Sequence, residues 1–274
     1  MIDLHLHSRA SDGTLAPAAL VALAAQRQVR LMSLTDHDTL EGTHEAASAA
    51  KQASLRFVPG VEISVSWENK TLHVVALDVD PEHPVLSSGL ARLQAVRDAR
   101  AVEIGRRLEA RGATGAYAGA ERLADGARLT RTHFARFLHE AGHVKDEAQA
   151  YRKFLGHGKP GNVIATWASL EEALSWIHGA GGQAVLAHPF RYGLTRAWLV
   201  KVLTAFKQAG GDAMEVVSGR GNPDELHVAA HLAARFELAG SVGSDFHAPA
   251  PYSQPGVAVE LPASVKPVWE RFRN

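Results

Sequence analysis

The chain opens with apolar and polar residues in alternation, the pattern of a β-strand in which every second side chain shares a face. The leucines of this strand lie on one face, and His5 and His7 share the other. A helix is expected next, with Thr14 as its cap, Pro17 in its first turn and an alanine-rich run to about Gln28. Because the two imidazoles point the same way, they can reach a single ion.

Short apolar runs then alternate with helical patterns along most of the chain. Further strands are expected at residues 31–35, 57–65, 71–79, 183–187, 213–217 and 238–244. Helices are expected at residues 40–53, 85–111, 131–141, 146–155, 169–181, 195–210 and 223–238. A turn at residues 68–70 predicts an antiparallel hairpin, which interrupts the regular repeat. Buried strands separated by helices favour an α/β fold with a parallel sheet, whose chemistry collects at the carboxyl ends of the strands.

Residues 81–161 differ from the rest because their pattern is helical and contains no convincing strand. Chain-breaking residues stand at both ends of the segment, in residues 80–84 and 156–161. We interpret it as a small helical insertion that caps the substrate. The insertion divides a barrel into a first part, residues 1–80, and a second part, residues 162–274.

Arginine is dense on the long helix of this insertion, and most of these side chains are expected to be solvated. Arg97 and Arg100 lie one turn apart and are neighbours on the helix surface. Arg131 and His133 stand at the start of the next helix, where an anion is well placed. These four residues are candidates for binding substrate. The alternative for His133 is a surface histidine at the start of a helix.

Composition narrows the classes of function. The sequence has 29 Lys+Arg and 29 Asp+Glu, so no long-range field attracts duplex nucleic acid or an anionic membrane. Cysteine is absent, which removes thiolate ligands and cysteine nucleophiles and suits a cytoplasmic location. No run approaches the length of a membrane span, and no leader is recognised before the first strand. The 15 histidines stand out, since histidine is the commonest metal ligand.

Nine ionisable residues fall at or beside the ends of the expected strands. They are His5, His7, Asp12, His37, Glu62, His73, His188, Asp245 and His247. Glu62 and His73 stand among apolar neighbours, where an uncompensated polar group is costly. Nitrogen and oxygen donors without sulfur suit Mn, Zn or Fe, and nine are too many for one ion. Two or three divalent ions would attract a phosphate and acidify a water, so the sequence predicts a hydrolase of phosphate esters.

The segments that carry these residues resemble, in order, the motifs of the PHP (polymerase and histidinol phosphatase) family. They are Asp3–Ser8, Ser11–Thr14, Thr35–Asp38, Gly60–Glu62, His73, Ala187–Pro189 and Gly243–His247. The resemblance covers residues 1–80 and 165–260. It implies a distorted (β/α)7 barrel of PHP type and a trinuclear metal centre in which Glu62 is a bridging ligand. The implied ligand sets are His5, His7, Glu62 and Asp245 for one ion, Asp12, His37 and His247 for a second, and His73 and His188 for a third.

The insertion and the segment 131–133 resemble one branch of that family, the nucleoside 3',5'-bisphosphate phosphatases and the related 5'-3' exoribonucleases of short RNA. The resemblance implies a manganese enzyme that cleaves the 3'-phosphate of a small nucleotide such as adenosine 3',5'-bisphosphate. Arginines of the insertion would bind the other phosphate. Asp245, or a histidine that supports the ligands, is the candidate proton carrier, and His133 is the candidate for contacting substrate or protonating the leaving oxygen.

Other functions stay open at this point. The same centre suits an exoribonuclease on short RNA or another small-molecule phosphatase of the histidinol phosphatase kind. A related barrel could hydrolyse carbon–nitrogen bonds, and a non-catalytic metal-binding module is a further alternative. The complete set of donors argues against the last, because a decayed site loses ligands.

Overall fold

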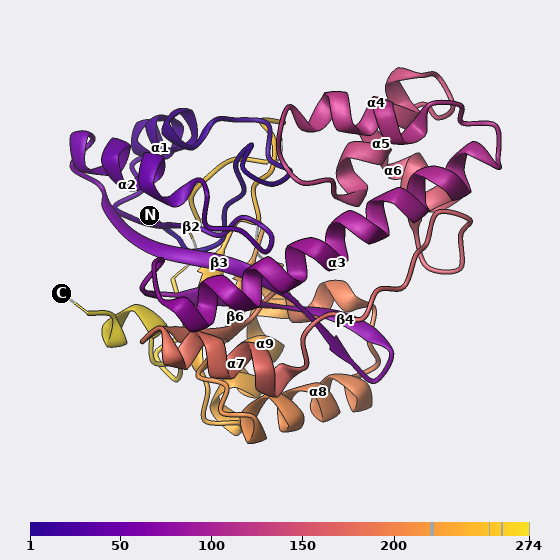
Figure 1. Cartoon of the computed structure of the whole chain (residues 1–274). Helices are drawn as coiled ribbons and strands as arrows, with labels where there is room; N and C mark the ends of the chain where they lie inside the picture. Colours follow the sequence, from indigo (N-terminus) through magenta and orange to yellow (C-terminus); the bar gives the residue numbers. More distant parts are fainter. Residues whose placement is uncertain (220–221, 252, 259, 274) are drawn as a thin grey trace.

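The computed structural model contains a sheet that closes almost completely on itself (Figure 1). It describes residues 1–219, 222–251, 253–258 and 260–273. Within that part, seven strands follow one another around the sheet in sequence order. They are β1 (Ile2–Asp3), β2 (Leu31–Leu34), β3 (Arg56–Trp67), β4 (Lys70–Leu77), β5 (Gln183–Leu186), β6 (Ala213–Ser218) and β7 (Ala239–Gly243). Leu4 N donates to Val242 O at 3.0 Å and His7 N to Phe246 O at 2.9 Å, so the first and last strands meet.

Strand β4 runs against both of its neighbours, whereas the other adjacent pairs among the described strands are parallel. The reversal begins at a two-residue turn, in which Trp67 pairs with Lys70. The turn residues Glu68 and Asn69 have φ values of 45° and 60°, as a hairpin turn of type I′ requires. The predicted α/β fold and its hairpin-distorted barrel are therefore confirmed.

The helices lie close to the expected positions. They are α1 (Pro17–Gln26), α2 (Thr43–Gln52), α3 (Pro84–Glu109), α4 (Ala116–Ala124), α5 (Arg131–Glu140), α6 (Glu147–Ala150), α7 (Leu170–Gly179), α8 (Arg196–Gln208) and α9 (Pro223–Arg235). A π-helical turn, Tyr151–Leu155, follows α6. The expectation that Thr14 caps the first helix is wrong, because Ala16 holds the cap position and the Thr14 hydroxyl donates to His247 O at 3.3 Å. Helix α4 had no counterpart in the predicted elements.

Alternate residues of β3 face opposite sides of the barrel wall. Val61, Ile63 and Val65 are fully buried on the outer side, in a cluster with apolar residues of α3 and α7. Glu62, between the first two, is also fully buried, but on the inner side. The interior below it is filled by a separate apolar cluster that includes Val75. The barrel thus has polar side chains at its mouth and apolar side chains in the interior below them.

Helices α4, α5 and α6 pack together beside the barrel, at the upper right in Figure 1. They share a hydrophobic cluster with the second half of α3, which contributes Ile104 and Leu108. The first half of α3 packs on the barrel through Leu86 and Leu93. All of residues 81–161 are described, and none lies in a strand. Helix α3 therefore joins two separate apolar cores.

None of the described helices combines the length and the apolar character needed to cross a membrane.

Candidate metal centre and substrate pocket

The nine residues singled out in the sequence converge at the mouth of the barrel. Their donor atoms form overlapping groups, and within each group the atoms lie within 4.8 Å of one another. The groups are His7, Asp12, His37 and His247; His5, His7 and Asp245; His5, Glu62 and His188; and His37, Glu62 and His73. We refer to these nine residues as the donor cluster. Every member of the predicted ligand set is part of it.

The segments around Leu6 and Phe246 place their donor residues in the same way. Leu6 and Phe246 pair as parallel neighbours and are buried. The residues before and after each of them therefore face the other way, into the mouth of the barrel. His5 Nε2 and His7 Nε2 lie 3.1 Å apart, and Asp245 Oδ1 lies 3.2 Å from His7 Nε2. The alternation that predicted the histidine pair thus also places Asp245.

Glu62 lies at the centre of the donor cluster and has no exposed surface. Its carboxylate oxygens lie 2.8 to 3.4 Å from ring nitrogens of five histidines. These are His5, His7, His37, His73 and His188. Burial alone raises the pKa of Glu62, but the surrounding imidazoles outweigh it and hold that pKa well below its usual value. Glu62 is therefore an ionised group in contact with much of the cluster.

The donor cluster fits divalent ions because several of its buried polar atoms lack hydrogen-bond partners in the part of the chain that the structure describes. Five buried atoms lack a hydrogen bond of acceptable geometry within the described residues, although other polar atoms lie close. They are His7 Nδ1, Asp12 Oδ1, His37 Nδ1, Glu62 Oε2 and His188 Nδ1. Buried polar atoms without partners are costly, and a cation between them removes that cost. Imidazole and carboxylate donors without sulfur suit Mn, Zn or Fe.

Glu215 of β6 supports the cluster from outside and was missed in the sequence. Its Oε1 lies 2.5 Å from His5 Nδ1, and its Oε2 accepts from His188 N at 2.7 Å and from Ser218 Oγ at 2.7 Å. A carboxylate on one ring nitrogen fixes the orientation of the ring and raises the basicity of the other nitrogen. A lone acidic residue in an apolar strand was the signal that identified Glu62, and it applies equally to Glu215.

Replacing Glu215 by glutamine is expected to lower metal affinity about 10- to 100-fold, because His5 loses the carboxylate that orients it. Titration of the metal-free protein with Mn²⁺ by calorimetry measures this. The exposed Glu237→Gln is the matched control, with unchanged affinity. Equal affinities for the two variants would show that Glu215 does not act through His5.

Asp36 fixes the loop that leads to Asp12. It accepts hydrogen bonds from Ser8 N at 2.8 Å, Ser8 Oγ at 2.6 Å and Ser11 Oγ at 2.6 Å. Burial raises the pKa of Asp36 to about 6 despite these donors. The loop that carries Asp12 is therefore fixed by buried hydrogen bonds to Asp36.

A small cavity of about 60 Å³ lies between the donor cluster and the insertion. Its barrel side includes Asp12, His37 and His73, and its insertion side includes the three arginines singled out in the sequence. These are Arg97, Arg100 and Arg131. We refer to this cavity as the arginine pocket. The structure thus brings the predicted substrate-binding arginines against one side of the donor cluster.

Arg97 differs from the other two because it already has an anionic partner. It is buried and forms an ion pair with the fully buried Asp38 through Nε and Nη2, the former at 3.2 Å. Its Nη2 also donates to Ser64 Oγ at 3.0 Å. Arg97 therefore ties α3 to the barrel while its positive charge lies beside the arginine pocket.

Arg100 and Arg131 have less complete partnerships. Arg100 Nε donates to Val163 O at 3.0 Å, and the Arg131 guanidinium lies 5.9 Å from the ring centre of Tyr151. Burial and the neighbouring Arg131 and Arg97 lower the pKa of Arg100 to about 9. Three cations held this close repel one another, so an anion in the pocket would be bound favourably.

His133 is buried at the start of α5, so the alternative of a surface histidine is wrong. Its Nδ1 accepts from Thr130 N at 3.1 Å, which closes a capping box. Burial lowers the pKa of His133 to about 4. The ring is therefore neutral near pH 7, with its proton on Nε2, and can donate a hydrogen bond.

Helix α5 also contacts the donor cluster directly, which the sequence did not reveal. Thr132 Oγ1 donates to Asp12 Oδ2 at 3.0 Å, and Arg136 Nη2 donates to Asp12 O at 2.7 Å. Thr132 Oγ1 lies 3.3 Å from Tyr151 OH in the π-helical turn. The insertion therefore helps to fix one of the candidate ligands.

Comparison with known proteins agrees with this geometry. A family model described as PHP domain matches residues 3–111. A 5'-3' exoribonuclease of Haemophilus influenzae is 45% identical over 270 residues, which are 98% of this chain and 98% of that protein. A 3',5'-nucleoside bisphosphate phosphatase of Chromobacterium violaceum is 46% identical over 273 residues, 99% of this chain and 96% of that protein.

A solved structure from Chromobacterium violaceum, described as an amidohydrolase with bound sulfate, superimposes with a TM-score of 0.94 at 45% identity. The match covers 98% of this chain and 95% of that one. Both relatives are named for the cleavage of phosphoester bonds. The chain therefore belongs to the PHP domain family, and it is a phosphoesterase.

Proposed function

We propose that this chain removes the 3'-phosphate from nucleoside 3',5'-bisphosphates, giving the 5'-monophosphate and phosphate. The observation that carries the proposal is the arginine pocket directly beside the donor cluster. A single phosphate at the cluster needs no second cationic site, whereas a substrate with two phosphates does. The relative from Chromobacterium violaceum is named for this reaction.

The donor cluster is proposed to bind two or three divalent ions, with Mn²⁺ as the expected metal and Zn or Fe as alternatives. The proposed ligand sets are His5, His7, Glu62 and Asp245; Asp12, His37 and His247; and His73 and His188. When bound, the ions would acidify a water and neutralise charge on the reacting phosphate.

The protein's own groups have separate roles in this proposal. Arg100 and Arg131 bind the 5'-phosphate, and Arg97 adds positive charge while fixing α3. Neutral His133 donates a hydrogen bond from Nε2 towards the leaving oxygen. Burial raises the pKa of Asp245, but His5, His7 and His247 hold it well below its usual value, so this carboxylate is ionised and suited to hold a cation. Asp245 is also the proposed proton carrier. The segment 81–161 acts as the substrate cap.

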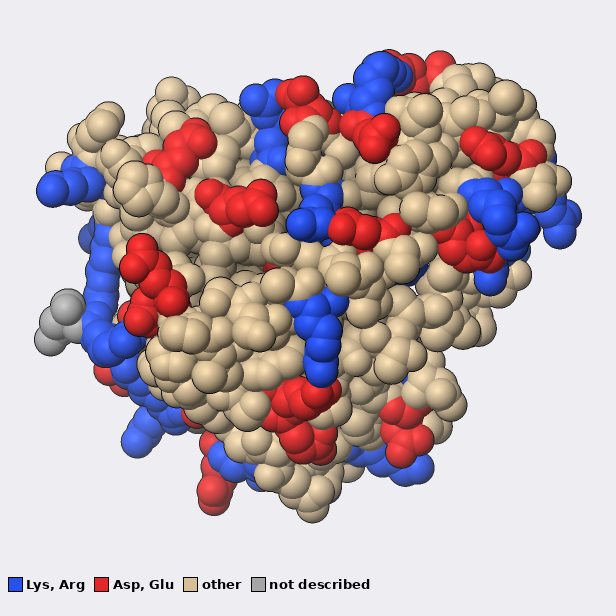
Figure 2. All heavy atoms as spheres, in the orientation of Figure 1, with Lys and Arg blue, Asp and Glu red and all other residues tan. Residues whose placement is uncertain are grey.

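Surface charge supports a small substrate. Basic and acidic side chains are interspersed over the face shown in Figure 2, and the net charge of the sequence is zero. Such a face offers no extended cationic track for a duplex backbone. Phosphate binding is then expected at the donor cluster and in the arginine pocket.

The experiment that tests the proposal is phosphate release, with and without Mn²⁺, from a panel of substrates. The panel contains adenosine 3',5'-bisphosphate, 3'-AMP, 5'-AMP and histidinol phosphate. The bisphosphate is expected to have the highest kcat/KM, since it alone reaches both the cluster and the arginine pocket. Equal efficiency on 3'-AMP, or a preference for histidinol phosphate, would overturn the proposal.

A further inference from the structure

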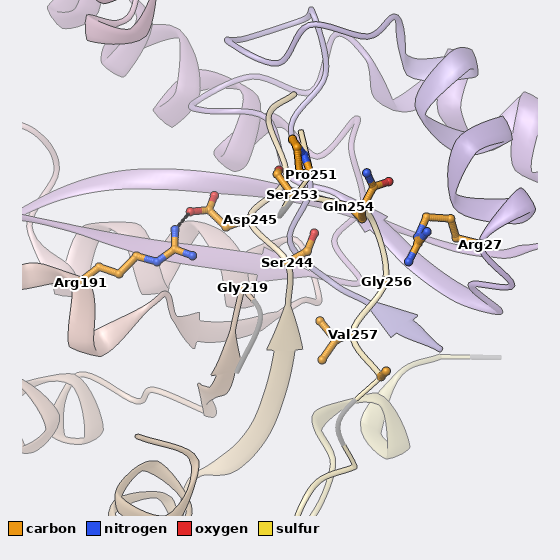
Figure 3. A pocket seen from close by; sticks show the side chains of 11 residues that line it. Arg27, Arg191, Gly219, Ser244, Asp245, Pro251, Ser253, Gln254, Gly256 and Val257 are labelled. Carbon is orange, nitrogen blue, oxygen red and sulfur yellow. Dashed lines mark hydrogen bonds and ion pairs between the residues drawn. The ribbon is translucent and has the colours of Figure 1, made fainter. Parts of the chain in front are cut away.

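The turn that follows β5 brings the chain back to the donor cluster. A 3₁₀ turn, Pro189–Tyr192, begins directly after His188, and Arg191 N donates to His188 O at 2.9 Å. The Arg191 guanidinium forms an ion pair with Asp245, as Figure 3 shows. Tyr192, the last residue of the turn, packs against His188 with the ring centres 5.2 Å apart and the ring planes inclined at 60°. Tyr192 thus contacts the donor cluster without belonging to it, and the proposed function gives it no role.

The Tyr192 hydroxyl lies between the ends of two neighbouring strands. Strands β4 and β5 are antiparallel, and their register, continued by one residue, places His73 opposite Ala187. Ala187 N donates to His73 O at 3.1 Å, and in a hydrogen-bonded pair of this kind the reciprocal bond runs from His73 N to Ala187 O. Instead, His73 N donates to the Tyr192 hydroxyl at 2.8 Å, and the hydroxyl donates to Ala187 O at 3.0 Å. One side-chain oxygen therefore completes the strand pairing.

The inserted hydroxyl affects the spacing of the two strand ends. It has a single proton to donate, and Ala187 O at 3.0 Å is nearer than His73 O at 3.4 Å. The oxygen occupies the space in which a direct bond from His73 N to Ala187 O would form, so the two strands are held apart at this point. His188 follows Ala187 in the chain. The opening therefore lies where His73 and His188 enter the donor cluster.

The relative position of these two histidines is well defined. His73 Nδ1 and His188 Nε2 lie 3.4 Å apart, and they lie 2.9 and 3.0 Å from the same oxygen, Glu62 Oε1. The backbone of His188 has φ of 26°, a conformation that a residue with a side chain adopts at a cost. The set proposed for the third ion consists of these two histidines, and the other two sets are larger. The affinity of the third ion is therefore expected to depend strongly on the spacing of this pair.

We propose that Tyr192 is a positioning residue whose hydroxyl sets the separation of His73 and His188, and with it the affinity for the ion that this pair would hold. The inference rests on the proposed metal centre but not on the identity of the substrate. The ring of Tyr192 adds a second constraint, because it packs against His188. The two contributions can be separated by experiment, since phenylalanine keeps the ring and removes the oxygen.

Calorimetric titration of the metal-free protein with Mn²⁺ tests the inference without turnover. His73→Ala identifies the class of bound ions that depends on the histidine pair. Tyr192→Phe is expected to weaken that same class about 10- to 100-fold, as the loss of a group that supports a ligand does, and to leave the other ions unchanged. Tyr117→Phe is the matched control, because Tyr117 packs against the apolar cluster of the insertion, and it should have wild-type affinities.

A double variant distinguishes positioning from a general loss of stability. Tyr192→Phe combined with His73→Ala should bind Mn²⁺ as His73→Ala alone does, because Tyr192 acts through that pair. A crystal structure of the Mn²⁺-loaded wild type needs no variant, and it should keep the Tyr192 hydroxyl within hydrogen-bonding distance of His73 N and Ala187 O.

Three results would overturn the inference. They are equal weakening of all ions in Tyr192→Phe, unchanged titrations of Tyr192→Phe or His73→Ala, and a loaded structure in which the hydroxyl has left both backbone atoms. The titration contains no nucleotide, so failure of the bisphosphate proposal would leave its outcome unchanged. Failure of the positioning role would in turn leave the ranking of the substrate panel unchanged.

Discussion

Glu62→Gln is expected to lower kcat/KM for adenosine 3',5'-bisphosphate by about 10³-fold or more. The amide has nearly the same shape, but it lacks the negative charge that lies within 2.8 to 3.4 Å of five imidazoles. Without that charge, neighbouring cations repel one another and metal affinity falls. Steady-state kinetics and elemental analysis of the same preparation, after reconstitution with Mn²⁺, measure both effects.

The control for this variant is Glu109→Gln, at the exposed end of α3. It should retain full activity and metal content, and both variants should show the circular dichroism spectrum of the wild type. A Glu62→Gln protein that binds two or three equivalents of metal and turns over normally would remove Glu62 from the proposed ligands. An active wild-type enzyme with less than one equivalent would contradict the multinuclear centre.

Arg131→Ala is expected to lower kcat/KM for the bisphosphate about 30- to 10³-fold, the loss seen when one member of a desolvated charge pair is removed. The reason is that the 5'-phosphate would lie in the arginine pocket with one of its cations missing. For 3'-AMP, which has no 5'-phosphate, the same substitution should change kcat/KM by less than about threefold. Initial rates over a range of concentrations of each substrate give kcat/KM for the variant and for the wild type, and the ratio of these two values is compared between the substrates.

Arg111→Ala is the matched control, because Arg111 is an exposed arginine of the same insertion that does not line the pocket. Its kcat/KM for the bisphosphate and its kcat/KM for 3'-AMP should both equal those of the wild type. Parallel losses on both substrates for Arg131→Ala would mean that this arginine supports the fold or the donor cluster and does not bind the second phosphate.

The donor cluster could be foreseen because its signals are local. A strand repeats every two residues, so His5 with His7 and Asp245 with His247 were each assigned to one face from spacing alone. Parallel strands end at one edge of a sheet, which brings residues far apart in the sequence together without further information. The antiparallel direction of β4 was likewise predicted from a local signal, the turn at residues 68–70.

Other features depend on contacts that no local pattern encodes. The pairing of Arg97 with Asp38 requires α3 to lie across β3, which follows from how two apolar cores dock. The contact from Thr132 to Asp12 depends on the same docking. Helix α4 was missed because it is only nine residues long and contains Gly119, so on its own it is a marginal helix, and it is stabilised by packing against α5.

None of the nine residues of the donor cluster comes from the segment 81–161, although that segment supplies the arginines beside it. In the proposed function the metal ligands and the contacts to the second phosphate thus come from separate stretches of the chain, and the segment enters and leaves the barrel at a single interval between β4 and α7. With the segment acting as the proposed substrate cap, such an arrangement allows it to be exchanged as a module. A transplanted cap would retarget the barrel to a new phosphate ester, provided that it kept two attachments to the mouth, the cation that pairs with Asp38 and the hydroxyl that donates to Asp12.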